Sequence, residues 1–360
     1  MSFQHQFIRL EGSARERGLT YGKVARERIA RCLNFYKKFF KAHVNLDWEE
    51  AKALALQFKP DIEAYFPETL VEMQSIAEGA GVNFEDILAL NCRSEILFAL
   101  PDGCTAVSFP PQATRDGNTV LAQTWDWLEP ARDCTVVLEV NQAPLPRILM
   151  VAEAGMVGGK GINEDGIGVT LNALSVGKGQ IGVPLHVMYR KILSAAILTD
   201  AIDAVTQAKR AGCGNFNIGS ACGIVSYVEF TPDDFAIEMS EGEPLCHTNH
   251  YLSPLFIKED ALKRAISDSF VRLNRVRVLT KGQKGYHVDS ILNVFCDHSN
   301  FPDSVCSHPD PNDPEMMRMC TIYAVVFDLT RREIWVTNSN PCQGPVSYTH
   351  LRAHETGAYL

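Results

Sequence analysis

Apolar side chains recur at helical spacing near the start of the chain. Within the segment 14–43 they lie three or four residues apart, at Ile29, Leu33, Tyr36 and Phe40. This spacing predicts an amphipathic helix. Similar patterns predict further helices at 47–65, 67–80 and 83–98. The first hundred residues are therefore expected to be mainly helical.

From Cys104 onward the pattern changes to short β-rich runs separated by turn residues. Strands are expected at 106–109, 120–122, 135–138, 168–171, 222–230, 234–240, 321–328 and 333–338. Asp116-Gly117-Asn118 predicts a hairpin turn between the first two runs. Helices are expected again at 184–197, 199–210, 260–279 and 288–297. Blocks of strands flanked by helices predict one α+β domain in which helices cover sheets.

Charge and composition narrow the possible partners. The chain has 360 residues, of which 34 are basic and 43 acidic, giving a net charge of -9. This balance offers no basic surface for nucleic acid, so we expect no nucleic-acid partner. No run approaches the ~18 apolar residues of a membrane span, so no membrane partner is expected either.

The cysteine content indicates a cellular compartment. The chain has 11 cysteines, and its first residues lack the basic and apolar regions of a secretory signal. An odd number of cysteines without an export signal predicts reduced thiols. We therefore expect a cytoplasmic protein.

Cys104 lies where the helical region gives way to the extended one, directly after Gly103. A backbone cut at this junction would give Cys104 an α-amine, whose pKa of ~7.7–8.0 suits a base for the thiol. Gly103 would tolerate the strained backbone that attack on its own carbonyl requires. The alternative is that Cys104 is a small buried side chain beginning a strand.

Two further polar residues are candidates for chemistry. Asp126 lies between Trp125 and Trp127, where burial would restrict its carboxylate strongly. Its alternative is a surface aspartate at a strand end. Asn249, within the polar segment His247–His250, could donate to a developing oxyanion. Its alternative is an ordinary turn-forming asparagine.

Cofactor and metal signatures are weak. The chain has no G-x-S-x-G elbow, phosphate-binding loop or dinucleotide-binding turn, so we expect no cofactor. A zinc site remains an alternative, because two C-x-H pairs lie close together at Cys296/His298 and Cys306/His308. Their internal spacing is shorter than zinc sites commonly use. Buried cysteines at a helix end and in a loop are the competing interpretation.

The last residues differ from the rest of the chain. The tail from Val346 resembles translated adaptor sequence more than the end of a packed domain. We therefore expect residues 346–360 to be disordered or non-native and take 1–345 as the folded domain.

Several short motifs together resemble one family. Their order and spacing are similar to those of the acyl-coenzyme A:6-aminopenicillanic acid acyltransferase family, also called the isopenicillin N acyltransferase group, among the N-terminal nucleophile hydrolases. The motifs are Asp102–Thr105, Trp125-Asp126 and His247–His250, supported by Arg17-Gly18, Tyr21-Gly22, Leu90–Glu95, Glu153–Gly158, Leu171–Leu174 and Gly182–Pro184. The resemblance runs through almost the whole chain before the tail.

The resemblance implies a four-layer αββα sandwich and a precursor that cleaves itself between Gly103 and Cys104. The resulting α chain (1–103) and β chain (104–360, with its body at 104–345) would stay associated. Cys104 would be the nucleophile, Asn249 the oxyanion donor, and Asp126 the partner of the new amine. The implied substrate is a small N-acyl compound or acyl thioester, with acyl-coenzyme A as one candidate.

One position departs from the family pattern. Where the family often has an arginine after its late helix, this chain has Ser307. Arg93 or Arg318 would have to supply the missing guanidinium, which matters for carboxylate recognition. A non-catalytic binding protein on the same fold is therefore the alternative to an enzyme.

Overall fold

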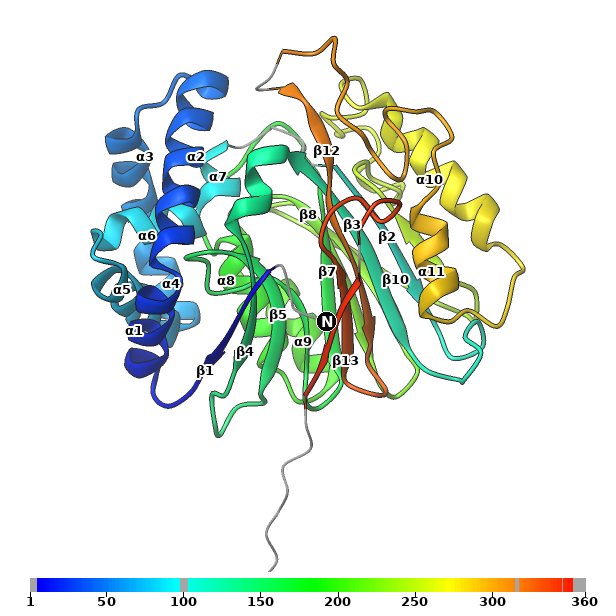
Figure 1. The fold of residues 1–360 in the computed structure, drawn as a ribbon, viewed down its shortest axis with the longest axis horizontal. Helices are drawn as coiled ribbons and strands as arrows, with labels where there is room; N and C mark the ends of the chain where they lie inside the picture. The colour runs from blue at the N-terminus through cyan, green and yellow to red at the C-terminus, as the bar shows by residue number, and fades with distance from the viewer. Residues whose placement is uncertain (1–4, 98–102, 315–316, 345, 352–360) are drawn as a thin grey trace, which may run out of the picture.

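Two sheets stack face to face between two layers of helices (Figure 1). The computed structural model describes residues 5–97, 103–314, 317–344 and 346–351. Most helices lie on the left of the view, against one sheet. Two further helices lie on the right, against the second sheet. The predicted α+β class and four-layer αββα sandwich are confirmed.

The larger helical layer covers the first sheet. Its helices are α1 (Ala14–Val24), α2 (Arg26–Val44), α3 (Trp48–Ala55), α4 (Lys59–Tyr65), α5 (Pro67–Ala80), α6 (Phe84–Asn91), α7 (Arg93–Leu97), α8 (Leu185–Leu193) and α9 (Leu198–Thr206). The helix predicted at 14–43 is broken at Ala25, whose backbone leaves the helical region at φ -96° and ψ 11°. Helix α1 packs against α5 with almost no space between their backbones. A Cβ on Gly22 would lie 2.1 Å from the Ile76 carbonyl oxygen.

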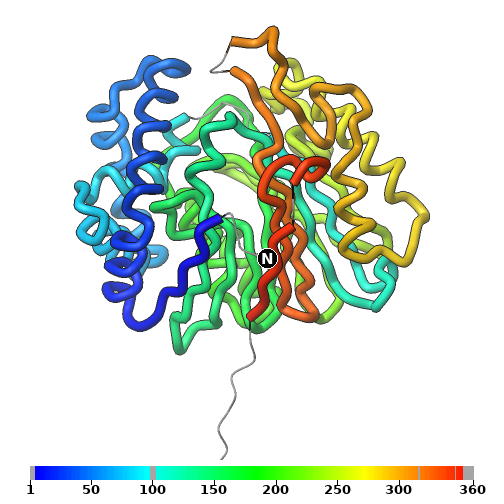
Figure 2. Tube along the Cα trace, viewed as in Figure 1, coloured from blue at the N-terminus to red at the C-terminus, as the bar shows by residue number. Residues whose placement is uncertain are grey.

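The first sheet is eight-stranded, with the order β1-β4-β5-β6-β7-β8-β9-β10. Its strands are β1 (Gln6–Leu10), β4 (Thr135–Val140), β5 (Ile148–Glu153), β6 (Lys160–Asn163), β7 (Ile167–Ala173), β8 (Gly214–Ser220), β9 (Val225–Phe230) and β10 (Phe235–Met239). Although far apart in the chain, β1 and β4 pair in parallel (Figure 2). The sequence did not predict β1, β5, β6 or β8. Glycine and asparagine occupy four of the seven positions of β8, and both are depleted in strands.

The second sheet carries the candidate nucleophile. Its six strands follow the order β11-β2-β3-β12-β13-β14. They are β2 (Gly103–Phe109), β3 (Val120–Leu128), β11 (Leu245–His247), β12 (Met319–Asp328), β13 (Glu333–Thr337) and β14 (Val346–His350). Helices α10 (Ser267–Thr280) and α11 (Val288–Phe295) cover its outer face. The predicted hairpin joins β2 to β3, with Gly117 in the left-handed region at φ 70°.

The tail prediction is wrong for part of its length. Val346–His350 forms β14, which pairs antiparallel with β13. The Tyr348 ring lies 5.2 Å from the Trp335 ring, and its hydroxyl donates to Glu333 at 2.8 Å. Cross-strand contacts of this kind explain why the segment is ordered. Residues 352–360, like Asp102 and the last residue of the helix predicted at 83–98, lie outside the described residues.

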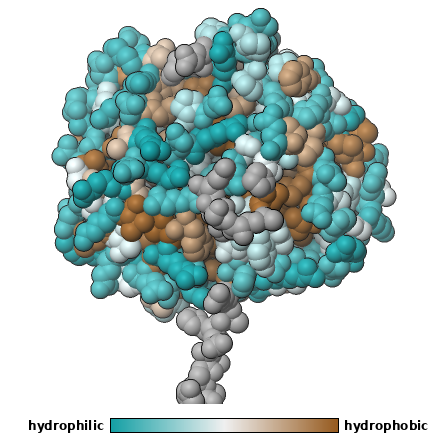
Figure 3. Space-filling model, in the orientation of Figure 1, coloured by the Kyte–Doolittle hydropathy of each residue, from teal (hydrophilic) through white to brown (hydrophobic). Residues whose placement is uncertain are grey.

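The surface has a mixed character. On the face shown in Figure 3, hydrophilic residues predominate and apolar residues form small separate patches. In the described part of the chain, no helix is both long enough and apolar enough to cross a membrane.

Candidate active site

The β2–β3 ladder sets the direction of the key side chains. Cys104 pairs with Trp125, and Gly103 pairs with Asp126. Paired residues of a sheet share a face and successive residues alternate. Cys104, only 1% exposed, therefore lies with Trp125 on the face toward the other sheet. Gly103 and Asp126 lie on the face toward α10.

Three side chains hold the backbone of Cys104. Its N–H donates to Asn249 Oδ1 at 2.8 Å. Its carbonyl oxygen accepts from Arg272 Nη1 at 2.9 Å and from Asn172 Nδ2 at 3.2 Å. These partners come from the segment after β11, from α10 and from β7, so both helix and facing sheet fix the residue.

The orientation of the Asn249 amide follows from its neighbours. Oδ1 also accepts from Arg272 Nη2 at 3.0 Å. The Cys104 N–H and the guanidinium can only donate, so the oxygen must face them. Nδ2 consequently points to the Ala173 carbonyl, 3.3 Å away. The Asn249 backbone is held as well, because its N–H donates to Ser269 Oγ at 2.8 Å.

Arg272 supplies a guanidinium beside Cys104, a role that sequence reasoning missed. It is 3% exposed and pairs with Asp268, four residues earlier on α10, at 2.8 Å. An aspartate and arginine at this spacing are typical of an exposed helix face, so no signal distinguished them. Of the two arginines proposed instead, Arg318 donates to the carbonyls of Pro311 and Asp313, while Arg93 lines a cavity described below.

Asp126 lies opposite Gly103, the residue before the candidate nucleophile. Thr321 Oγ1 donates to Asp126 Oδ1 at 2.6 Å and accepts from the Ser307 N–H at 2.9 Å. A cavity of about 100 Å³ opens here, lined by Gly103, Asp126, Ile266, Asp268, Arg272, Asp303, Ser304, Ser307 and Met319. The position where the family often has arginine thus faces the Gly103 peptide. Water or a reacting group has room beside that peptide.

Gly103→Ala is expected to slow cleavage before Cys104. An added Cβ would lie 2.8 Å from Asp126 Cβ and 3.0 Å from Asp126 Oδ2. Overpacking of this kind costs ~1–3 kcal/mol, and ~1.4 kcal/mol changes a rate ten-fold, so we expect a slowing of roughly ten-fold or more. Time-resolved denaturing gels of freshly expressed protein measure it. Gly212→Ala, where the nearest atom would be 3.9 Å away, serves as the control.

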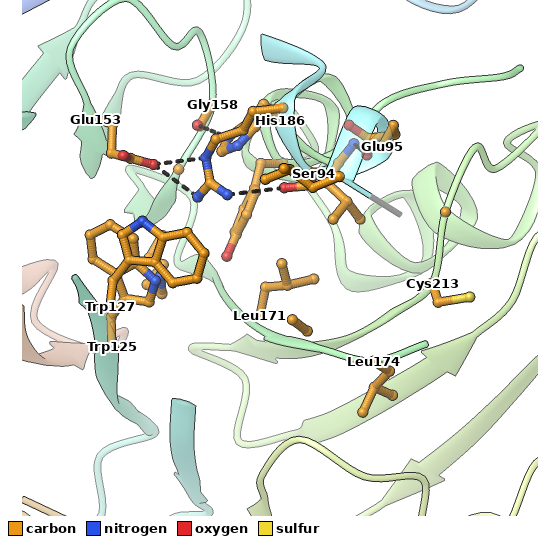
Figure 4. Close-up of a pocket in the computed structure, with 18 of the residues that line it drawn as sticks. Ser94, Glu95, Trp125, Trp127, Glu153, Gly158, Leu171, Leu174, His186 and Cys213 are labelled. Atoms are coloured by element: carbon orange, nitrogen blue, oxygen red, sulfur yellow. Dashed lines mark hydrogen bonds and ion pairs between the residues drawn. The ribbon is translucent and has the colours of Figure 1, made fainter. Parts of the chain in front are cut away.

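A second cavity, of about 90 Å³, lies on the Cys104 face of β3 (Figure 4). Aromatic and aliphatic side chains form much of its wall, including Trp125, Trp127, Leu171, Leu174, Leu185 and Tyr189. Arg93 enters it from α7, held by Glu153 at 2.8 Å. The mixture of apolar surface and a few fixed polar groups is typical of a small-molecule site.

Some polar atoms around this cavity have no hydrogen-bond partner within the described residues. They are Trp127 Nε1, His186 Nε2 and Glu95 Oε2. Burial lowers the pKa of His186 to about 3, so its ring is neutral at pH 7. Nδ1 lies 3.0 Å from the Gly158 carbonyl and must donate to it, which leaves Nε2 as an acceptor. The wall of the cavity thus holds an unpartnered donor, Trp127 Nε1, an unpartnered acceptor, His186 Nε2, and one unpartnered oxygen of the Glu95 carboxyl.

Glu95→Gln is expected to stabilise the fold increasingly as the pH rises from ~4.3 to about 7. Burial raises the pKa of Glu95 to about 7. Between the unfolded pKa of ~4.3 and about 7, the carboxyl of Glu95 loses its proton only in the unfolded state. The wild-type fold therefore becomes less stable as the pH rises through this range. Glutamine retains the acceptor for the Leu185 N–H. The Tm difference between variant and wild type should be near zero at pH 4 and grow until about pH 7. A difference independent of pH would contradict the prediction.

The zinc ligands predicted from the sequence do not assemble as a set. His298, Cys306 and His308 converge, but the fourth member of the cluster is Cys342 rather than Cys296. The sequence grouping failed because Cys342 comes from a connection 34 residues further along the chain. Only the tertiary fold brings it near.

Comparison with known proteins places the chain among enzymes that transfer acyl groups. The model of the family described as acyl-coenzyme A:6-aminopenicillanic acid acyl-transferase matches residues 113–343, and the chain belongs to that family. The expected family and enzyme class are confirmed. The matched segment begins after Cys104, so the match does not itself include the proposed nucleophile.

Individual relatives were also found. The chain is 26% identical over 340 residues to the 40 kDa form of acyl-coenzyme A:6-aminopenicillanic-acid-acyltransferase from Emericella nidulans, covering 93% of this chain and 92% of that protein. Among solved structures, a Caenorhabditis elegans ortholog of N-acylethanolamine-hydrolyzing acid amidase is 14% identical, with TM-score 0.45, covering 69% of this chain and 100% of that one. A mutant conjugated bile acid hydrolase from Clostridium perfringens is 12% identical, with TM-score 0.46, covering 69% and 97% respectively.

Proposed function

We propose that the chain is a self-processing amidohydrolase or acyltransferase whose nucleophile is Cys104, acting on small N-acyl compounds or acyl thioesters. The observation that carries the proposal is the fixed environment of the Gly103–Cys104 peptide. Its N–H is bound by Asn249, the following carbonyl by Arg272, and Asp126 lies against Gly103. Buried backbone groups of a strand are usually paired with a neighbouring strand, whereas here side chains supply the partners of Cys104.

Maturation begins with attack of the Cys104 thiol on the Gly103 carbonyl. The C–N bond breaks, a thioester forms, and the departing nitrogen takes a proton to become the free amine. Water then hydrolyses the thioester, leaving a carboxylate on Gly103 and restoring the thiol. The cavity beside Gly103 and Asp126 has room for that water. The two chains would stay together because their helices and sheets share one core.

In turnover, the new α-amine of Cys104 accepts the thiol proton, and the thiolate attacks the substrate carbonyl. The amine lies where its nitrogen already faces Asn249 Oδ1. Asn249 Nδ2 donates one hydrogen to the Ala173 carbonyl at 3.3 Å, and its second hydrogen would donate to the tetrahedral oxyanion. An acyl-enzyme on Cys104 results. Water as acceptor gives hydrolysis, and an amine gives acyl transfer.

The lining of the cavity that contains Trp125 and Trp127 suits a small acyl substrate. Trp125 and Trp127 provide apolar surface on the Cys104 face, while Arg93 and Lys160 add positive charge at its wall. Lys160 Nζ lies 5.0 Å from the centre of the Trp125 ring, a cation–π distance. Positive groups of this kind would suit a donor bearing phosphate or carboxylate, such as acyl-coenzyme A.

The test is to incubate processed protein with a simple acyl thioester, with and without an amine acceptor, and to map the acylated residue by mass spectrometry. The proposal predicts an acyl group on Cys104 and, on adding acceptor, release of acid, acylated amine or both. Formation of acylated amine faster than free acid would identify a transferase. A thiol that is never acylated would contradict the proposal and favour a binding protein on the same fold.

A further inference from the structure

We propose that His298, Cys306, His308 and Cys342 form a structural zinc site on the outer side of the second sheet. The four ligand atoms lie within 4.8 Å of one another. Two thiols and two imidazoles are the ligand set that structural zinc sites use in tetrahedral coordination. The proposal of a zinc site does not rest on the proposed enzymatic function.

Four of the six separations between ligand atoms are close to those of a tetrahedron around zinc. Bond lengths of ~2.3 Å to sulfur and ~2.05 Å to nitrogen require about 3.8 Å between sulfurs, 3.5 Å between sulfur and nitrogen, and 3.3 Å between nitrogens. Here the sulfurs of Cys306 and Cys342 are 3.5 Å apart. His308 Nε2 lies 3.6 Å from Cys306 Sγ and 3.5 Å from Cys342 Sγ. It lies 3.1 Å from His298 Nε2. His298 Nε2 lies within 4.8 Å of both sulfurs, so binding an ion would complete the set by drawing this ring toward them.

Other contacts favour a metal over a chance cluster. Asn340 Nδ2 lies 3.7 Å from Cys306 Sγ and donates to the Ser307 carbonyl at 2.6 Å. A donor to a ligating sulfur orients it and stabilises its thiolate form. His298 and Cys342 are exposed, so an ion can reach the site from solvent. All four positions are protein ligands, which indicates a structural rather than a catalytic metal.

The position of the site in the fold indicates what a bound ion would stabilise. Cys306 lies in the connection between α11 and β12, while Cys342 lies in the connection between β13 and β14. An ion would fasten these two connections together. Ser307, next to Cys306, donates to Thr321, which in turn donates to Asp126. The metal would therefore stabilise the wall of the cavity beside Gly103.

The experiment measures metal in the full-length protein, purified under reducing conditions. We expect about one zinc per chain, and after removal of zinc we expect Co(II) to bind with the intense visible absorption of a tetrahedral thiolate complex. Cys342→Ser should lose both properties. Because Cys342 is exposed, this variant tests the site with little risk of unfolding. His308→Ala provides a second test.

Matched controls separate this site from its alternatives. Cys296→Ser and Cys222→Ser remove cysteines outside the cluster and should keep full zinc content. Asn340→Ala should keep zinc but bind it ~10–100-fold more weakly, as loss of a supporting contact does. Three results would overturn the proposal. They are a folded, reduced wild type that takes up neither ion, loss of zinc in Cys296→Ser but not Cys342→Ser, or a Cys306–Cys342 disulfide in place of metal.

Discussion

The Cys104→Ala variant is expected to remain a single chain. Its acyl-transfer and hydrolytic activity should fall on the order of 10⁴- to 10⁶-fold, the loss seen when a catalytic nucleophile or its partner is removed. Without the thiol, nothing attacks the Gly103 carbonyl, so the precursor persists. Even if the chain were cut, no group could carry the acyl intermediate. Denaturing gels and turnover of an acyl thioester measure the two losses separately.

Cys246→Ala is the matched control for this variant. Cys246 is also buried, and it lies on β11, opposite Val107 of β2. Burial raises the pKa of its thiol to about 11, which makes it a poor nucleophile. The control should be cleaved and active. Cleavage of Cys104→Ala at the wild-type rate would contradict the assignment of the nucleophile.

Asn249→Asp and Asn249→Ala are both expected to lower kcat by ~10²–10³, the usual loss for one oxyanion donor. The aspartate retains an oxygen facing the Cys104 nitrogen and Arg272, but it replaces the Nδ2 donor with an acceptor. If Asn249 acts by donating to the oxyanion, the two variants lose turnover alike. If it acts by holding the nitrogen of Cys104, the aspartate retains most of the activity.

Steady-state kinetics of the processed fraction distinguish these outcomes. Asn274→Asp, the same change at an exposed position of α10, controls for the added negative charge. We expect kcat to fall with little change in KM, because the donor acts on the transition state. Wild-type kcat in Asn249→Asp would contradict the oxyanion role.

Much of the fold followed from local patterns. The 3.6-residue periodicity predicted the N-terminal helices, and the change at Cys104 predicted the first strand of the second sheet. The break at Ala25 could not be predicted, because alanine favours a helix and the apolar spacing of Tyr21, Ala25 and Ile29 continues across it. The strand β8 was missed because its pairing with β7 and β9 on either side, and not its content of glycine and asparagine, determines its conformation.

The candidate site was predicted only in part. The junction at Gly103 and Cys104 was visible because a glycine before a cysteine at a change of pattern is a local feature. Arg272 was not, since its spacing from Asp268 is that of a surface ion pair. Its importance comes from the packing of α10 on β2, which no local pattern encodes. Cys342 was absent from the predicted zinc ligands because only tertiary packing brings it close to the other three residues.

The intact mass of the purified wild-type protein under denaturing conditions tests the central claim most directly. The proposed mechanism predicts two chains whose masses correspond to residues 1–103 and 104–360, with an unblocked cysteine at the start of the second. A single uncut chain of 39.9 kDa that still turns over an acyl substrate would contradict it.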